Sequence, residues 1–134
     1  MIKKIHHIGI VVKNLDDAMK TYTKVLGKAP ESVNEIPAAK IRLANYRVGE
    51  TVLEFLEGAA GTPMADFISQ RGEGLHHIAV EVDDIAGELK KLAAAGVALR
   101  DKEPRQGPEV KIAFVGPDGA CGVTIELMQP DRKK

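Results

Sequence analysis

Four residues of types that bind metal ions occur in the sequence as two His…Glu pairs. The first pair is His7 and Glu54, which are 47 residues apart, and the second is His77 and Glu126, which are 49 residues apart. Imidazole nitrogen and carboxylate oxygen together suit Zn²⁺, Co²⁺, Mn²⁺, Fe²⁺ or Ni²⁺ and leave coordination positions for water or substrate. We therefore predict a divalent metal centre with these four side chains as its ligands.

The surroundings of the two glutamates favour this interpretation. Glu54 lies within residues 52–56, Val-Leu-Glu-Phe-Leu, and Glu126 lies within residues 123–128, Val-Thr-Ile-Glu-Leu-Met. A carboxylate among apolar side chains is energetically costly unless it is paired or bound to a cation. A single strand histidine is more often a hydrogen-bonded structural residue, but the same His…Glu pair recurring in register favours a metal site.

The two pairs belong to an internal repeat, which has to be recognised before local structure is predicted. Residues 5–12 read Ile-His-His-Ile-Gly-Ile-Val-Val, and residues 75–82, shifted by 70 positions, read Leu-His-His-Ile-Ala-Val-Glu-Val. Alternation along a strand sends neighbouring side chains to opposite faces of a sheet. We therefore expect His7 and His77 on one face, and His6 and His76 on the other face in structural roles.

Each half of the repeat predicts a strand, a helix and further strands. Asn14 and Asp84 are expected to cap the two helices, and Gly27 and Gly96 to end them. Pro30 and Pro37 indicate a loop after the first helix. The expected strands lie near residues 3–12, 40–47, 51–57, 75–82, 97–100, 110–115 and 122–128, with a short linker helix near 64–70.

These elements predict an α+β fold of two tandem βαβββ modules that form a curved half-barrel sheet around a metal site. A lone module would leave one face of its sheet uncovered, so the two modules should pack together as one domain. We expect a single domain over residues 1–134, with module one at about 3–57, a linker at about 58–73 and module two at about 74–129.

Bulk composition excludes several classes of protein. The 134 residues carry 19 basic and 19 acidic side chains, so no net charge favours nucleic acid or an anionic membrane. A single cysteine, Cys121, excludes an intramolecular disulfide and a cysteine-rich zinc site. There is no apolar run of about 18 residues and no signal-peptide pattern. We expect a cytoplasmic protein with neither nucleic acid nor membrane as a partner.

Longer stretches resemble a known family. The repeated unit with His…Glu…His…Glu is similar to the vicinal oxygen chelate superfamily, which includes glyoxalase I and the bleomycin resistance proteins. Residues 71–79, Arg-Gly-Glu-Gly-Leu-His-His-Ile-Ala, resemble methylmalonyl-CoA epimerases more closely. The same holds for residues 82–85, 103–105, 112–114 and 122–127. The resemblance covers nearly the whole chain, and its second half is the more specific part.

The resemblance implies a chemistry for the four candidate ligands. By that resemblance, His7, Glu54, His77 and Glu126 hold the divalent ion, Glu126 also transfers protons, and the position of Glu54 accepts glutamine in the family. The substrate is then a 2-carboxyacyl-CoA, epimerised by 1,1-proton transfer at C2 through a metal-stabilised enolate, and the chain is expected to form a homodimer.

One stretch departs from the family pattern. Family members often carry Glu-Gln-Gly-Val before the third strand, and some place a second proton-transfer glutamate near it. Residues 36–41 of this chain read Ile-Pro-Ala-Ala-Lys-Ile. Lys40 and Glu35 are the nearest candidates for the second acid–base group.

Two other functions are compatible with the sequence. A glyoxalase-I-like lactoylglutathione lyase would use the same ligands and the same proton chemistry. A metal-free small-molecule binding protein of this fold would not need the complete His/Glu set, so we expect an enzyme.

Overall fold

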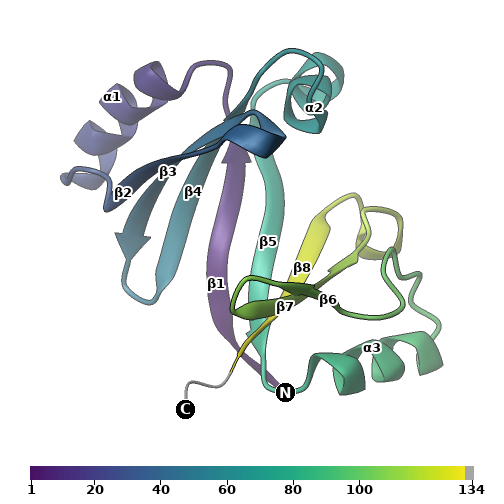
Figure 1. The fold of residues 1–134 in the computed structure, drawn as a ribbon. Coiled ribbons are helices and arrows are strands. Elements are labelled where there is room, and N and C mark those ends of the chain that lie inside the picture. Colours follow the sequence, from purple (N-terminus) through teal and green to yellow (C-terminus); the bar gives the residue numbers. More distant parts are fainter. Residues whose placement is uncertain (132–134) are drawn as a thin grey trace. The chain divides into compact units, whose positions relative to one another are not determined.

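The computed structural model describes residues 1–131, with Gly119 described only as backbone. This part of the chain contains eight strands and three α-helices (Figure 1). They are β1 (Ile2–Val11), α1 (Leu15–Leu26), β2 (Ser32–Ile36), β3 (Ile41–Val48), β4 (Thr51–Gly58), α2 (Pro63–Arg71), β5 (Gly74–Val82), α3 (Ile85–Ala94), β6 (Arg105–Gly107), β7 (Val110–Val115) and β8 (Thr124–Pro130). Two short 3-10 helices, η1 (Pro37–Ala39) and η2 (Asp118–Ala120), precede β3 and β8.

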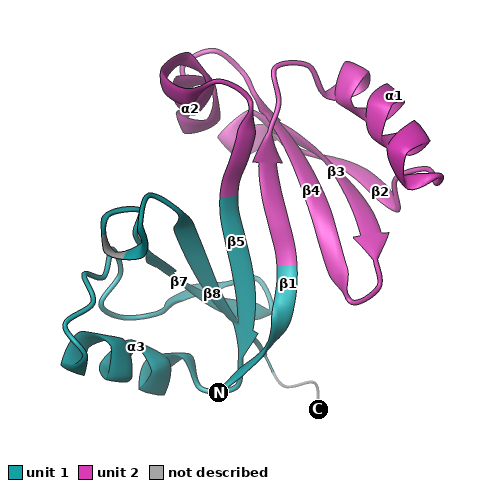
Figure 2. Ribbon diagram, turned by 180° about the vertical axis from the view of Figure 1, so that it is seen from behind, with its two compact units in different colours: residues 1–6, 77–134 teal, residues 7–76 magenta. Residues whose placement is uncertain are grey.

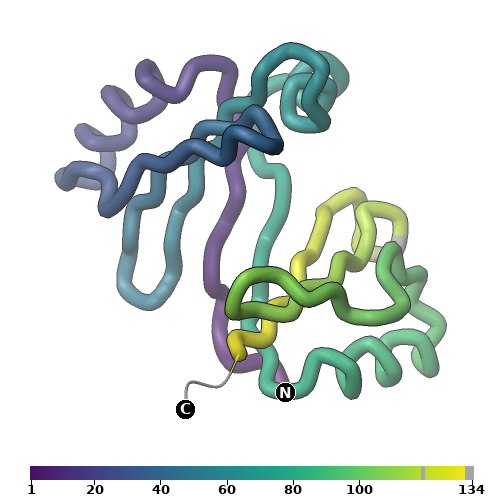
Figure 3. Tube along the Cα trace, in the orientation of Figure 1, coloured from purple at the N-terminus to yellow at the C-terminus, as the bar shows by residue number. Residues whose placement is uncertain are grey.

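The eight strands form one mixed sheet in the order β2-β3-β4-β1-β5-β8-β7-β6. Strand β1 is parallel to β4, and strand β5 is parallel to β8. The hairpins β3–β4 and β7–β8 are antiparallel, and the Cα trace shows the tight reversal between β3 and β4 (Figure 3). The order β2-β3-β4-β1 is repeated as β6-β7-β8-β5, so the predicted α+β fold of two βαβββ modules is confirmed.

The chain divides into two compact units (Figure 2). Unit 1 contains residues 1–6 and 77–134, and unit 2 contains residues 7–76. The divisions fall inside β1 and β5, between the two histidines of each His-His pair. The predicted single domain and its module bounds stay a prediction. No helix among residues 1–131 is both long and apolar enough to cross a membrane.

In unit 2, helix α1 begins and ends where the sequence predicts. The Asn14 side chain accepts a hydrogen bond from the Asp17 N–H, and Gly27 closes the helix at φ 69°. The helix covers a cluster formed by β1, β3 and β4 in which Tyr46 and Phe55 are completely buried. The Tyr46 hydroxyl donates to the Met19 carbonyl oxygen at 3.2 Å, so the helix is tied to the sheet by a hydrogen bond as well as by apolar contact.

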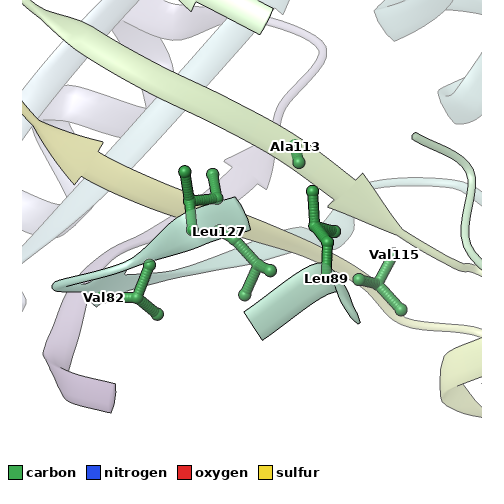
Figure 4. Close-up of a cluster of buried hydrophobic side chains, with 6 residues drawn as sticks. Val82, Leu89, Ala113, Val115 and Leu127 are labelled. Carbon is green, nitrogen blue, oxygen red and sulfur yellow. The ribbon is translucent and has the colours of Figure 1, made fainter. Parts of the chain in front are cut away.

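In unit 1, helix α3 has the equivalent position. The Asp84 side chain accepts from the Gly87 N–H, and the helix then buries Leu89 against β5, β7 and β8. Figure 4 shows the resulting cluster of Val82, Leu89, Ala113, Val115 and Leu127. Fully burying one such aliphatic side chain contributes about 1.5–3 kcal/mol to folding, so this cluster fixes which side of each strand faces the helix.

Two edge strands differ from the sequence prediction. Residues 32–36, expected to belong to a loop, form β2, and residues 97–100, expected to form a strand, contribute only an isolated bridge between Leu99 and Val115. The outer strand of unit 1 is instead β6, Arg105–Gly107. Both outer strands are mostly exposed, so their hydrogen-bonded partners determine their positions and hydrophobic alternation does not.

Candidate active site

In unit 1 the structure brings His77 and Glu126 together. They lie on the parallel strands β5 and β8, where Ala79 is directly opposite Glu126. The distance from His77 Nε2 to Glu126 Oε1 is 3.8 Å, and their side chains are 8% and 13% exposed. The neighbouring Leu127 points into the cluster under α3, so Glu126 projects from the opposite face of the sheet. A buried imidazole and a largely shielded carboxylate at this spacing have the donor chemistry of a divalent metal site.

In unit 2 the arrangement of His7 and Glu54 is equivalent. Strand β1 is parallel to β4, and Gly9 lies directly opposite Glu54. His7 is buried, and its side chain shares the face of Gly9 and Glu54 because strand side chains alternate. Phe55, the next residue after Glu54, is buried under α1 on the other face. Each glutamate thus has a very small residue directly opposite it on the neighbouring strand, Gly9 or Ala79.

The two remaining histidines occupy the other face of their strands, as alternation predicts. The His76 ring lies 5.0 Å from the Phe67 ring, measured between centroids, in an edge-on arrangement with α2. His6 is half-buried on β1, next to the buried His7.

Glu35, one of the two candidates for a second acid–base group, lies on the wrong face of the sheet. It is directly opposite Arg42, which is in turn opposite Glu57. Glu57 accepts a hydrogen bond from the Leu15 N–H at the start of α1, at 3.0 Å, so this row of side chains is on the helix-covered face. Glu54 points to the other face, and Glu35 is therefore corrected to a surface ion-pair partner of Arg42, 3.8 Å away.

Lys40, the second candidate, stands between the 3-10 helix η1 and strand β3. Its backbone has φ 55°, in the left-handed region, and its N–H donates to the Pro37 carbonyl oxygen. Its side chain is exposed.

Sequence reasoning did not identify a group of charged side chains around Phe114, the residue directly opposite Glu126. Phe114 on β7 is directly opposite Glu126 on β8, so the two side chains share one face. The guanidinium carbons of Arg100 and Arg105 lie 5.3 Å and 5.5 Å from the centroid of the Phe114 ring. Asp101 accepts hydrogen bonds from the Phe114 N–H at 2.8 Å and from Arg105 at 2.9 Å. No periodicity links residues 100–105 to Phe114, because their contact depends on the position of β6.

The contacts of Asp101 predict a pH-dependent contribution to stability. Burial raises the pKa of Asp101, but the hydrogen bonds from Arg105 and from the Phe114 N–H outweigh burial and hold this pKa below its ordinary value. A carboxyl whose pKa is lowered by folding stabilises the fold above its unfolded pKa, about 3.9, and loses this contribution as the pH falls through its folded pKa.

Replacing Asp101 by Asn should therefore lower the free energy of unfolding at pH 7 by about 1 kcal/mol, because the ion pair with the half-exposed Arg105 is lost. Urea denaturation should show the difference from wild type shrinking towards zero in acid. Glu103→Gln, which removes an exposed carboxylate from the same segment, is the control. Equal stability of wild type and Asp101→Asn at pH 7 would contradict the assignment.

Comparison with known proteins identifies the family. The model of the Glyoxalase/Bleomycin resistance protein/Dioxygenase superfamily matches residues 6–114. The chain belongs to this superfamily, and its fold is the glyoxalase-like, vicinal oxygen chelate fold.

The relatives within the superfamily have different activities. The chain is 36% identical to the uncharacterised protein YqjC of Bacillus subtilis over 131 residues, covering 96% of this chain and 94% of the relative. It is 34% identical to a probable lactoylglutathione lyase of Vibrio cholerae, over 94% of this chain and 90% of the relative. It is 32% identical to the mitochondrial methylmalonyl-CoA epimerase of Dictyostelium discoideum, over 94% of this chain and 78% of the relative.

A solved structure of an epimerase has the same fold. A variant of Streptomyces coelicolor methylmalonyl-CoA epimerase, in complex with 2-nitronate-propionyl-CoA, matches with a TM-score of 0.82 and 26% identity. The match covers 97% of this chain and 96% of that protein. Methylmalonyl-CoA epimerases are thus among both the sequence relatives and the structural relatives of this chain.

Proposed function

We propose that this chain is a metal-dependent methylmalonyl-CoA epimerase that interconverts the 2R and 2S forms by 1,1-proton transfer at C2. The observation that carries the proposal is the pair of the buried His77 and the largely shielded Glu126, 3.8 Å apart, with Ala79 directly opposite Glu126. Such a pair supplies a metal ligand and a carboxylate that can accept a proton, side by side on one sheet face. The epimerases among the relatives support the substrate class of this proposal.

The proposal includes one divalent ion bound by His7, Glu54, His77 and Glu126. Two imidazoles and two carboxylates suit Co²⁺, Mn²⁺, Zn²⁺, Ni²⁺ or Fe²⁺. Both histidines are buried, and a neutral imidazole offers a ring-nitrogen lone pair to a metal ion. When bound, the ion would polarise the thioester carbonyl as a Lewis acid and stabilise the negative charge that develops as the C2 proton leaves.

Glu126 is proposed to remove the C2 proton. Its carboxylate is largely shielded from water, shares a sheet face with the ring of Phe114 and is held in place by the strand that buries Leu127. A second group returns a proton to the opposite side of C2, which inverts the carbon. Glu54 is proposed to act as a ligand only, and Lys40 is the remaining candidate for the second proton transfer.

A glyoxalase-I-like lactoylglutathione lyase is the second candidate function, favoured by the Vibrio cholerae relative. It would use the same four side chains to move a proton between the two carbons of a glutathione hemithioacetal. This reaction gives a different product from a different substrate, so one set of assays separates the two functions.

The deciding experiment follows the C2 proton of methylmalonyl-CoA by NMR in D₂O, with the protein loaded with Co²⁺. We expect the C2 signal to disappear by exchange, and the methylglyoxal–glutathione adduct to be isomerised much more slowly. The metal-free protein is the control and should exchange the proton slowly. Fast turnover of the adduct without exchange into the thioester would assign the chain as a lyase. If the protein catalyses neither reaction, the proposed function is wrong.

The assembly and the location of the protein remain predictions. The homodimer is expected from the family resemblance, and sedimentation at micromolar concentration measures it. The cytoplasmic location is expected from the sequence pattern alone.

A further inference from the structure

Two arginines gather around one aromatic ring on the face of unit 1 that carries Glu126. Arg105 on β6 is opposite Ile112, and alternation along β7 puts Ile112 and Phe114 on the same side. The guanidinium carbons of Arg100 and Arg105 lie 5.3 Å and 5.5 Å from the Phe114 ring centroid. Phe114 is in turn directly opposite Glu126. The two guanidinium groups therefore lie around the ring of the residue directly opposite the proposed catalytic carboxylate.

The charges of this group are not balanced. Asp101 accepts a hydrogen bond from Arg105 at 2.9 Å and thereby compensates one positive charge. Among the residues that the structure describes, none forms an ion pair with Arg100, whose side chain is exposed and contacts the face of Phe114. One positive charge thus remains beside the active-site face.

The Phe114 ring also limits the positions that the guanidinium groups can take. A ring contact occupies the flat face of a guanidinium group and leaves its N–H edges free to donate, in the fork that matches a carboxylate or a phosphate. Asp101 fixes Arg105 further, because the same carboxylate accepts from the Phe114 backbone at 2.8 Å. The donors are therefore positioned before a ligand arrives, which lowers the entropic cost of binding.

We infer that Arg100 and Arg105, positioned by Phe114 and Asp101, form an anion subsite that binds an oxyanion group of the acyl-CoA substrate. This inference rests on the proposed function. The oxyanion is either the free carboxylate of the 2-carboxyacyl group or a phosphate of the CoA part, and both match guanidinium donors. The subsite would hold the substrate so that C2 stays beside Glu126.

The test compares Arg100→Ala with Lys90→Ala. Arg100 is exposed, so its removal leaves the core intact, and Lys90 is an exposed cation on α3, the helix that covers the opposite face. Each variant loses one positive charge, but only the first loses a guanidinium at the subsite. Arg105→Lys, which keeps the charge and loses the fork, is a second probe. C2 exchange kinetics are measured with methylmalonyl-CoA and with methylmalonyl-pantetheine, which lacks the CoA phosphates.

With methylmalonyl-CoA, Arg100→Ala should raise KM about tenfold at low salt, the effect of one lost charge-assisted hydrogen bond, and leave kcat nearly unchanged. The increase should become smaller at high ionic strength because the group is exposed. Lys90→Ala should behave as wild type. If Arg100→Ala raises KM for both methylmalonyl-CoA and methylmalonyl-pantetheine, the bound anion is the acyl carboxylate. If it raises KM for methylmalonyl-CoA alone, the bound anion is a CoA phosphate.

Failure of the inference is distinguishable from failure of the proposed function. If wild type exchanges the C2 proton and Arg100→Ala and Arg105→Lys both keep the wild-type KM for both substrates, the inference is wrong and the proposed function stands. If wild type shows no exchange, the proposed function is wrong, and calorimetric titration with CoA and with methylmalonyl-CoA then decides the subsite. The anion subsite would be overturned if wild type bound neither CoA nor methylmalonyl-CoA, or if Arg100→Ala bound both with the affinities of wild type.

Discussion

Glu126→Gln should reduce the rate of C2 proton exchange on the order of 10²–10⁴-fold when the metal-binding sites are equally occupied. The amide keeps an oxygen for the metal ion and nearly the same volume, but it cannot accept the C2 proton. Glu54→Gln should keep most of the rate under the same conditions, because an oxygen ligand is all that the proposed role of Glu54 requires.

The comparison of the two glutamine variants depends on metal occupancy. Weaker metal binding would imitate lost catalysis, so elemental analysis must show equal occupancy before the rates are compared. The structure provides a sharp control because Glu54 and Glu126 each lie opposite a very small residue, Gly9 or Ala79, on equivalent strand pairs. Equal exchange rates for the two loaded variants would make Glu126 a ligand only, and Lys40 would be the first position to test as the base.

His77→Ala should weaken metal binding by more than about 100-fold and abolish exchange. Even residues that only support a ligand contribute 10–100-fold to metal affinity, and His77 is proposed as a direct ligand. His76→Ala should leave the metal content nearly unchanged, because this ring contacts Phe67 of α2 on the other face of β5.

The two variants alter adjacent residues of one strand, which makes the pair a matched test. Metal content is measured by elemental analysis after dialysis, and circular dichroism checks that His77→Ala, which removes a buried side chain, remains folded. Equal loss of metal from both variants would mean that alternation along β5 does not decide which histidine binds the ion.

The elements predicted correctly are those whose sequence signals act locally. Asn14 and Gly27 bound α1 because a capping side chain and a left-handed glycine satisfy backbone groups within a few residues. The burial of Ile10 and Val80 towards the helices follows in the same way from alternation. These signals were also sufficient to place each predicted metal ligand on the face opposite the helices.

The features that sequence reasoning missed depend on contacts between distant residues. Strands β2 and β6 carry exposed side chains, so only their pairing with β3 and β7 defines them. The pairing of Glu35 with Arg42 determines the face on which Glu35 lies. The path of the chain between α3 and β7 brings Arg100 to Phe114. No local pattern encodes either arrangement.

The packing of Phe55 has a consequence for how this protein can be altered. Phe55 is completely buried between the rings of Tyr22 and Tyr46, with centroids 4.3 Å and 5.6 Å away, and it immediately follows Glu54. The proposed ligand therefore has an aromatic anchor one residue away, on the far side of the sheet. A substitution that weakens the packing of Phe55 would change the orientation of the Glu54 carboxylate, although none of the four proposed ligands is altered. On β4, substitutions that alter core packing and substitutions that alter metal binding therefore affect each other. A design for a different metal should change the ligand side chains and keep Tyr22, Tyr46 and Phe55.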